Sequence, residues 1–398
     1  MRWRMLGWIC LAELGALSLW FSATAVIPAL ATSWMSTDAK AWLSMAVTLG
    51  FVVGTVLSAL LTLADFVGAR RLFVLSAVAG ALVNAALLVV IDSLPLVLAC
   101  RFVTGLAMAG TYPPAMKLAA SWFVSDRGLA VGSLVGALTV GGAVPHLINF
   151  VLGGLTWPPV ILGTSLGALA AAAVMARLVR DGPHVQARAP FNPACVRELC
   201  RSRGVVLASL GYFGHMWELY AMWAWIGLYL MEGFHAAGVP AAPRLGALAT
   251  GAVFLVGAVS CVLAGGIADR IGRTATTMLA MVVSGSCAAV IGLVFDRPGL
   301  LVAVALIWGF TIIADSAQFS TSVTELAPPA YVGTALSLQT SLGFLLTLLS
   351  TWLVPRAAEA WGWAWAFAFL APGPFLGTLA MAGLRRLPES ARLAQGRR

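Results

Sequence analysis

Long apolar runs, separated by short polar segments, fill nearly the whole chain. A helix that crosses a bilayer needs about 20 mostly apolar residues, and twelve runs reach that length. Strands of alternating apolar and polar residues, which would suggest a membrane β-barrel, are absent from the sequence. The pattern therefore predicts an all-α integral membrane protein with twelve transmembrane helices. The runs cover residues 4–30, 41–63, 71–91, 94–118, 128–151, 158–179, 204–231, 244–267, 274–295, 299–322, 332–354 and 361–384.

The composition agrees with this prediction and limits the function. Of the 398 residues, 61% are apolar and 10% are charged, whereas soluble domains carry about 25% charged residues. A soluble enzyme and a disordered protein are excluded, because neither could keep so much apolar surface out of water. The net charge of +9 does not indicate nucleic-acid binding, because the basic residues lie between the apolar runs.

The basic residues also predict the orientation of the chain. With the N-terminus inside, 19 of the 24 Lys and Arg residues fall in the inside segments. Positively charged loops stay on the cytoplasmic side of a membrane. We therefore expect a multi-pass protein of a bacterial plasma (inner) membrane with both termini in the cytoplasm.

The longest loop, at about residues 180–203, divides the twelve runs into two sets of six. It contains three prolines and several arginines, and such a segment is a natural domain boundary. The predicted domains are an N-terminal six-helix bundle at 1–180, a cytoplasmic linker at 181–203, and a C-terminal six-helix bundle with a short cytoplasmic tail at 204–398.

The two halves repeat each other. The segments 64–68 and 268–272 share the pattern Ala-Asp-x-x-Gly at an offset of 204 residues. Glu13 and Glu218, each followed by a Trp seven positions later, are 205 residues apart, as are Gly128 and Gly333. Three places that agree within one residue predict a duplicated unit and hence two pseudo-symmetric bundles.

Twelve spans, a central basic loop and a doubled Gly/Asp/Arg loop after spans two and eight resemble the major facilitator superfamily. The second copy of the loop reads Gly-Gly-Ile-Ala-Asp-Arg-Ile-Gly-Arg at 265–273. The first copy, at 54–71, departs at Phe66, where the family usually has a basic residue. The resemblance covers nearly the whole chain. It implies two bundles that rock around a central site and give alternating access.

The doubled loop is a candidate cytoplasmic gate. Asp65 and Asp269 are predicted at the C-terminal ends of helices, where a carboxylate opposes the helix dipole and needs a basic neighbour. Such a contact can form in one gate state and break in the other; a solvated turn is the alternative. The glycines permit the tight turn. The predicted gate residues are Asp65, Gly68, Arg70, Arg71, Asp269, Arg270, Gly272 and Arg273.

Ionisable residues within the spans are the candidates for the transport site, since each costs about 2.5–3.5 kcal/mol to place in a membrane. Glu13 and Glu218 hold matching positions in the two halves, and His215 lies three residues before Glu218 on the same helix face. Buried carboxyl groups and His can exchange protons near neutral pH, which suits a proton carrier. The alternatives are a structural hydrogen bond and a direct substrate contact.

Other polar residues in the spans complete the candidate set. Arg101 opens the stretch Arg-Phe-Val-Thr-Gly, similar to a superfamily pattern in span four. It either balances an acid or an anionic substrate, or extends to the outer interface. His146 lines the cavity or packs structurally, and Asp315 with Gln318 binds a cation or pairs with a base. The predicted proton-coupling or substrate-cavity residues are Glu13, His215, Glu218, Arg101, His146, Asp315, Gln318 and Tyr112.

The predicted function is secondary active transport of a small polar or ionic solute by proton-coupled symport. Residues 112–123 are distantly similar to nitrate- and cyanate-type bacterial members, although the arginines that nitrate carriers place in spans two and eight are missing. The alternative is proton-coupled efflux of a cationic or amphiphilic compound, although the span-five pattern of drug antiporters lacks its Pro at 136–142. A non-transporting sensor and a copper carrier are less favoured.

The sequence carries no phosphate-binding loop and no catalytic constellation. We therefore expect no enzyme activity, no cofactor and no metal site. The expected partners are a small-molecule substrate, protons and the lipid bilayer, without nucleic acid, and the protein is expected to be monomeric.

Overall fold

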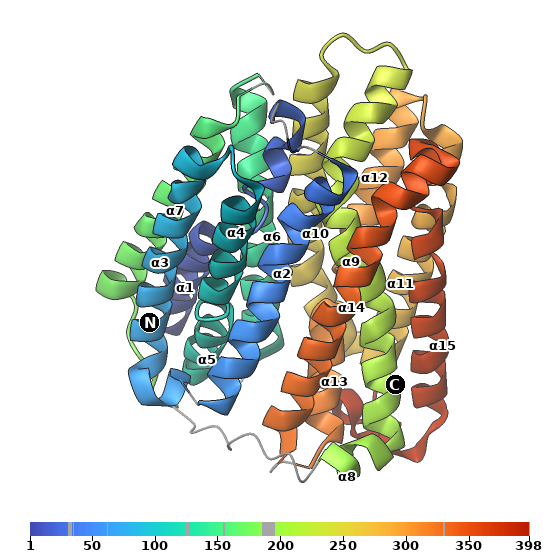
Figure 1. The fold of residues 1–398 in the computed structure, drawn as a ribbon. Coiled ribbons are helices and arrows are strands. Elements are labelled where there is room, and N and C mark those ends of the chain that lie inside the picture. The colour runs from blue at the N-terminus through green and yellow to red at the C-terminus, as the bar shows by residue number, and fades with distance from the viewer. Residues whose placement is uncertain are drawn as a thin grey trace.

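The part of the chain that the structure describes consists of helices joined by turns and short connecting segments, with no strand there. This computed structural model describes residues 1–30, 34, 36–61, 63–123, 127–153, 156–184, 196–328 and 331–397. Helices α1 to α7 form one bundle and helices α9 to α15 form a second, and the two bundles stand side by side (Figure 1).

The N-terminal bundle consists of α1 (Arg2–Leu17), α2 (Thr37–Leu60), α3 (Ala69–Val90), α4 (Leu94–Met108), α5 (Tyr112–Trp122), α6 (Arg127–Val151) and α7 (Pro158–Leu178). The C-terminal bundle follows the short α8 (Val196–Arg201) and consists of α9 (Arg203–Ala236), α10 (Ala242–Ile271), α11 (Arg273–Val290), α12 (Pro298–Ile312), α13 (Ser316–Leu326), α14 (Val332–Trp361) and α15 (Pro372–Arg386). One short segment, η2 (Ala64–Gly68), is a π-helix. The short 3-10 helices are η1 (Thr24–Ala29), η4 (Ile291–Val294), η6 (Trp363–Trp365), η7 (Ala368–Leu370) and η8 (Pro388–Gly396).

The predicted all-α class with twelve spans is confirmed. Ten segments of the described chain are long and apolar enough to cross a membrane. α1 followed by η1, together with α9, completes the twelve, and each packs against other spans of its own bundle. The domain boundary at 181–203 stays a prediction, because residues 185–195 lie outside the described part.

Four of the predicted spans are broken rather than continuous. Span one stops at Leu17 and resumes as η1, span four is divided into α4 and α5, and span ten is divided into α12 and α13. Span twelve begins with the short segments η6 and η7 before α15. Pro113 and Pro114, which lack the N–H that a helix needs, explain the break in span four. Broken helices leave backbone groups without helical partners, and in transporters such segments border cavities.

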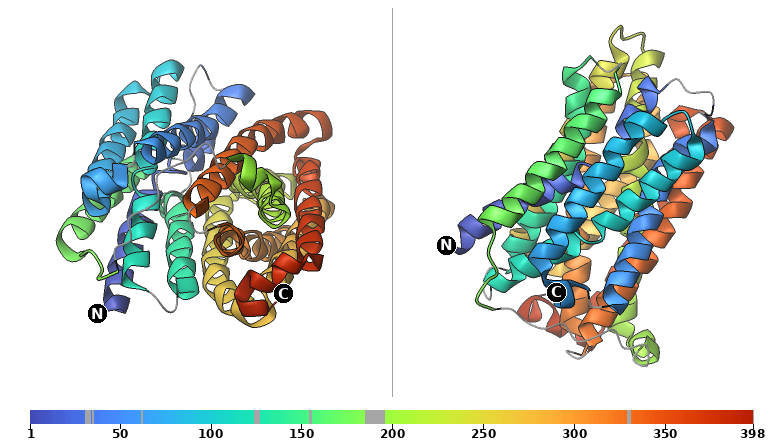
Figure 2. Two further views of the ribbon diagram at one scale, coloured as in Figure 1. Left: turned by 90° about the horizontal axis from the view of Figure 1, so that it is seen from below. Right: turned by 60° about the vertical axis from the view of Figure 1, so that its left-hand side comes forward.

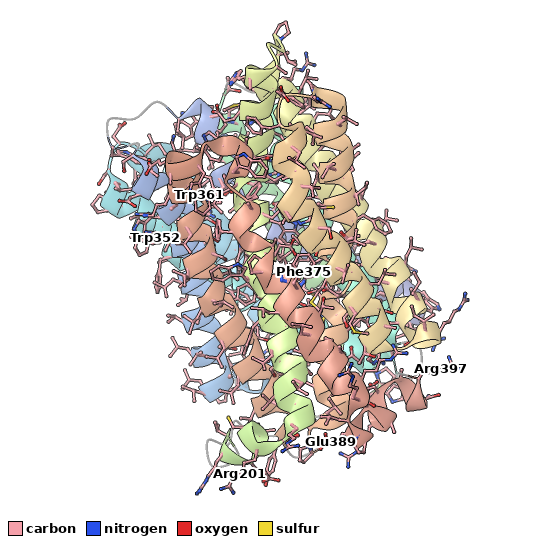
Figure 3. The ribbon with its side chains drawn as sticks, turned by 90° about the vertical axis from the view of Figure 1, so that its right-hand side faces the viewer. Arg201, Trp352, Trp361, Phe375, Glu389 and Arg397 are labelled. Atoms are coloured by element: carbon pink, nitrogen blue, oxygen red, sulfur yellow. The ribbon has the colours of Figure 1, made fainter. Side chains whose placement is uncertain are left out.

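The two ends of the molecule differ in chemistry. We call the end that holds both chain termini and α8 the base, and the opposite end the top. Figure 2 shows the two bundles from the base in its left panel. In the C-terminal bundle, Arg201, Glu389 and Arg397 lie at the base, whereas Trp352 and Trp361 lie at the top (Figure 3).

Small residues set the spacing of the helices. The two bundles meet along α6 with α10 and along α2 with α14. A Cβ atom on Gly132 of α6 would lie 2.9 Å from the carbonyl oxygen of Cys261 in α10. Within the N-terminal bundle, a Cβ atom on Gly50 of α2 would lie 1.9 Å from the carbonyl oxygen of Phe102 in α4. Close approach of this kind drives helix packing in membranes.

The turns after spans two and eight share one backbone conformation. Gly68 and Gly272 have φ angles of 88° and 96°, and each caps the N-terminus of the next helix. Glycine adopts such angles without a Cβ clash. Both copies therefore reverse at a glycine with a positive φ angle, which agrees with the pseudo-symmetry of the bundles.

Candidate functional site

A cavity lies between the two bundles. Its walls come from α1 and the break that follows it, α2, α5 and α6 in one bundle, and from α9, α13 and α14 in the other. None of the described residues that line it is charged; most are aromatic or aliphatic. Its side-chain hydroxyl groups belong to Tyr112, Tyr212, Tyr220, Ser316, Ser320 and Thr340.

Aromatic rings from both bundles close this cavity toward the top. Trp20, in the break of span one, contacts Phe51, Tyr220 and Phe344, with ring centroids 5.1, 5.4 and 5.9 Å away. Phe51 of α2 and Phe344 of α14 are 4.8 Å apart. We call Trp20, Phe51, Tyr220 and Phe344 the roof. The roof also offers a hydrogen-bond donor, because Trp20 Nε1 is buried without a partner among the described residues.

Above the roof, polar contacts join the top ends of α2 and α14. Asp38 pairs with Arg356, and Thr37 Oγ1 donates to Glu359 Oε1 at 2.5 Å. Both contacts cross from one bundle to the other. The top ends of the two bundles are therefore held together, whereas the cavity lining continues into the base half of α6 and into the first turns of α13.

Arg101 holds the break in span one. Its side chain is fully buried and donates to the carbonyl oxygens of Leu19 (3.1 Å), Trp20 and Leu43 (3.2 Å) and to Ser22 Oγ (3.2 Å). No carboxylate accepts from it in the described chain. Arg101 thus neither reaches an interface nor lines the cavity; it bonds the backbone that carries the roof residue Trp20.

The two symmetry-related glutamates have different surroundings. Glu218 accepts hydrogen bonds from Ser284 Oγ at 2.9 Å and from Trp308 Nε1 at 2.7 Å. Glu13 is fully buried, and neither of its oxygens has a partner in the described part of the chain. It lies one turn before Leu17, which lines the cavity, on the same face of α1.

His215 pairs with Asp315 rather than with Glu218. His215 Nδ1 lies 2.9 Å from Asp315 Oδ1, and both side chains are buried. Asp315 sits in the break of span ten, directly before the cavity residue Ser316. The pair therefore lies immediately behind the cavity wall. His215 Nε2 has no partner among the residues described.

Comparison with known proteins decides the family. A model of the major facilitator superfamily matches residues 9–351, most of the chain. The chain belongs to the major facilitator superfamily. Its structure is similar to the crystal structure of a D-xylose–proton symporter, with a TM-score of 0.73, 16% identity, and coverage of 96% of this chain and 98% of that one.

A second similar structure is the crystal structure of a mutant of the nucleoside transporter NupG. Its TM-score is 0.72 at 12% identity, with coverage of 96% of this chain and 98% of that one. At these identities the likeness shows the fold alone. No curated protein sequence matches the chain. Membership in a superfamily of transporters indicates a multi-pass membrane transporter rather than an enzyme.

Hydrogen bonds and ion pairs join the second copy of the superfamily loop to the C-terminal bundle. Arg273 donates through Nε and Nη2 to Glu325, at 2.9 and 2.7 Å, and through Nη1 to Gln318 Oε1 at 2.9 Å. Asp269 Oδ1 is 3.7 Å from Arg273 Nη1. Gln318, predicted near the cavity, therefore bonds a loop arginine, while Arg270 is exposed at the end of α10.

The C-terminal segment η8 docks on the same network. The backbone N–H of Ala394 donates to Glu325 Oε2 at 3.0 Å, and Arg397 donates to the carbonyl oxygen of Asp269 at 2.5 Å. Leu393 of this segment is fully buried. Sequence reasoning missed both Glu325 and this docking, because the acceptor lies 52 residues after the arginine that it binds.

The first copy of the superfamily loop differs. The side chain of Asp65 lies outside the described residues. Arg70 Nη1 donates to the carbonyl oxygen of Val179, at the end of α7, at 3.2 Å. Arg71 is exposed and has no partner in the described chain, and Phe66 is 88% exposed. The two copies thus share a turn and differ in what their arginines contact.

His146 borders a second, smaller pocket nearer the top, between η1 and α6 of one bundle and α9 and α10 of the other. Its ring stacks on Phe254 of α10, with centroids 5.7 Å apart. Asn149, three residues later, donates to the carbonyl oxygen of Ala25 at 3.0 Å. His146 is therefore an interface residue of the two bundles and lies outside the main cavity.

Proposed function

We propose that the protein is a proton-coupled symporter for a small uncharged solute that carries hydroxyl or carbonyl groups. The observation that carries this proposal is the lining of the main cavity, in which hydroxyl groups and aromatic faces occur without any charged side chain among the described residues. A charged solute would have to leave water without a counter-charge, at a cost of several kcal/mol.

The donors and acceptors of the cavity fit such a solute. Tyr220 and Ser316 can donate to or accept from a solute hydroxyl, and the unpaired Trp20 Nε1 can donate to an oxygen. Aromatic rings offer flat apolar faces to the remaining surface of the solute. The ionic part of the sequence prediction, including the likeness to nitrate- and cyanate-type members, gains no support from this lining.

We assign the proton to the carboxyl groups directly behind the lining. Glu13 has no cationic partner in the described chain, so it can gain or lose a proton without breaking an ion pair. Asp315 with His215 forms a second candidate on the opposite side of the cavity. Glu218 is favoured less, because two hydrogen bonds tie it to α11 and α12.

We further propose that the base is cytoplasmic, as the distribution of basic residues predicts. The structure then corresponds to an inward-facing state, with the roof closing the outer side. In the outward-facing state the roof and the Asp38–Arg356 contact separate, while the base of the bundles closes. Transport needs both states, and solute and proton shift the balance between them.

The test uses purified protein in liposomes loaded with a pH-sensitive dye. D-xylose, uridine and a polyol would be added in turn, with an organic acid and an organic cation as charged comparisons. We expect an uncharged solute to drive proton entry and the charged ones to be inactive. Proton entry driven only by charged solutes would refute the proposal, as would solute uptake without proton movement.

A second candidate is proton-coupled efflux of an amphiphilic compound. It is favoured by the rings of Trp20, Phe51, Trp223 and Phe344 in the lining, which would bind an apolar drug-like molecule. The same dye assay separates the two candidates. Symport acidifies the lumen when solute enters, whereas exchange of solute for protons makes it more alkaline.

A further inference from the structure

A shallow groove runs between α3 and α7 near the base. It is lined by Arg70, Arg71, Val74 and Leu75 of α3 and by Ala176 of α7. α3 and α7 lie side by side on the flank of the N-terminal bundle that faces away from the C-terminal bundle (Figure 1). The groove is therefore separate from the main cavity and faces the surrounding membrane.

The groove has a basic end and apolar walls. Arg70 and Val74, like Arg71 and Leu75, are four residues apart and so share a face of α3. Each arginine thus lies one turn nearer the base than an apolar side chain. The bond from Arg70 to the end of α7 fixes one guanidinium at the mouth of the groove, and Arg71 is exposed beside it.

In the internal repeat, these arginines do not occupy the position that corresponds to Arg273 of the second copy. Aligning Gly68 with Gly272 puts Ala69 opposite Arg273, and Ala69 is buried as Arg273 is. Arg70 and Arg71 follow one and two positions later. Because each helical residue turns by about 100°, their side chains leave the interior face that Arg273 uses and reach the α7 side.

The interior partner is also missing in the first copy. Glu325, which accepts from Arg273, corresponds at the offsets of the repeat to Ala120 or Ser121, neither of which is acidic. Phe66 stands where the second copy has Arg270 and is 88% exposed. The first copy therefore combines two outward arginines with an exposed aromatic ring at the level where a membrane has its headgroups.

We propose that this groove binds an anionic phospholipid of the base-side leaflet. Its phosphate is bound by Arg71 and Arg70, and one acyl chain lies along Val74, Leu75 and Ala176. Guanidinium groups bind phosphate oxygens in a bidentate manner, and basic pockets between membrane helices bind anionic headgroups. A zwitterionic headgroup brings its own cation and competes less well for two arginines.

The test measures lipid binding to the delipidated full-length protein by native mass spectrometry. Phosphatidylglycerol, phosphatidylcholine and glycerol phosphate would be titrated separately onto the wild type, onto R70Q/R71Q and onto R385Q/R386Q. The last variant is the matched control, because Arg385 and Arg386 are also adjacent and lie in the last turn of α15 at the base. Retention volume in size-exclusion chromatography would show that each variant is folded.

We expect phosphatidylglycerol to bind the wild type and the control about tenfold more tightly than R70Q/R71Q. Phosphatidylcholine and glycerol phosphate should bind weakly to all three. Equal phosphatidylglycerol binding by all three proteins would overturn the proposal. If phosphatidylcholine bound the wild type as tightly as phosphatidylglycerol, headgroup charge would play no part. Tight binding of glycerol phosphate would indicate a site for a free phosphate compound instead of a lipid. Either result would also overturn the proposal.

A second variant keeps both arginines. Ala176→Phe fills the groove from the α7 side, where Ala176 is exposed. It should weaken phosphatidylglycerol binding several-fold while leaving the basic charge unchanged. Undiminished binding by Ala176→Phe would show that no acyl chain occupies the groove and would contradict the proposal.

Discussion

Replacing Arg101 with leucine should loosen the roof of the main cavity. Arg101 is the only donor to the Trp20 carbonyl oxygen among the described residues, whereas Leu19 O also accepts from Ser22 Oγ at 2.9 Å. The substitution therefore leaves the buried Trp20 carbonyl oxygen without a donor, which costs about 1–3 kcal/mol, and it also removes further charge-assisted bonds. The net loss of stabilising free energy is about 3 kcal/mol. Because every 1.4 kcal/mol is tenfold, a roof held by this energy would open about a hundredfold more often.

The assay follows access to the cavity from the top. Met216, which lines the cavity, would be replaced by Cys in a chain whose six native Cys are replaced by Ala. A membrane-impermeant thiol reagent is then applied to intact cells. Arg101→Leu should raise the labelling rate at least about tenfold, whereas Arg386→Leu, which removes an exposed charge at the base, should not change it. An unchanged rate in folded Arg101→Leu would refute the role given to Arg101.

Three further predictions concern packing and the top contact. Glu218→Leu should lower stability by about 1–3 kcal/mol, because it leaves the buried Trp308 Nε1 without an acceptor, whereas Ser284 Oγ keeps its bond to the Met281 carbonyl oxygen at 3.3 Å. Glu218→Gln, which can still accept, should lose clearly less. Thermal unfolding in detergent measures both variants, and equal losses would contradict the assigned bonds. Gly50→Ala should abolish most of the folded protein, since its Cβ would lie 1.9 Å from a backbone oxygen. Gly7→Ala, whose Cβ would meet nothing within 4 Å, should be neutral. The yield of monodisperse protein, measured for both variants, tests this difference. Neutralising Asp38 or Arg356 should lower stability by at most about 1 kcal/mol, because the pair is partly exposed. A double-mutant cycle measures their interaction, and strictly additive effects would show that the two side chains do not interact.

The sequence predicted the spans well and their interruptions poorly. Apolar length alone places a span, so α2, observed at Thr37–Leu60, matches the run at 41–63 within a turn. The break in span four follows from two prolines. The break of span one at Leu17 has no such signal, because it depends on the tertiary bonds that Arg101 makes to its carbonyl groups.

The candidate site was predicted only in outline. Glu13 and Glu218 stand out in the sequence because an ionisable residue in a membrane span is energetically costly. Their matching positions in the two halves suggest equal roles. Their partners come from other helices, so the sequence could not show that Glu218 is paired and Glu13 is not. The aromatic lining was missed because rings are common in apolar helices. The signal that could have found it is the stripe of Tyr212, Met216 and Tyr220 at intervals of four residues on one face of α9.

The most direct test of the account compares Glu13→Gln with Glu218→Gln in dye-loaded liposomes. For the uncharged solute that the wild type transports, both solute exchange and solute-driven proton entry would be measured. The account predicts that Glu13→Gln still exchanges solute but no longer moves protons, because the unpaired carboxyl behind the cavity carries them. Glu218→Gln should keep both activities. Proton entry per solute that is unchanged in Glu13→Gln would contradict the account.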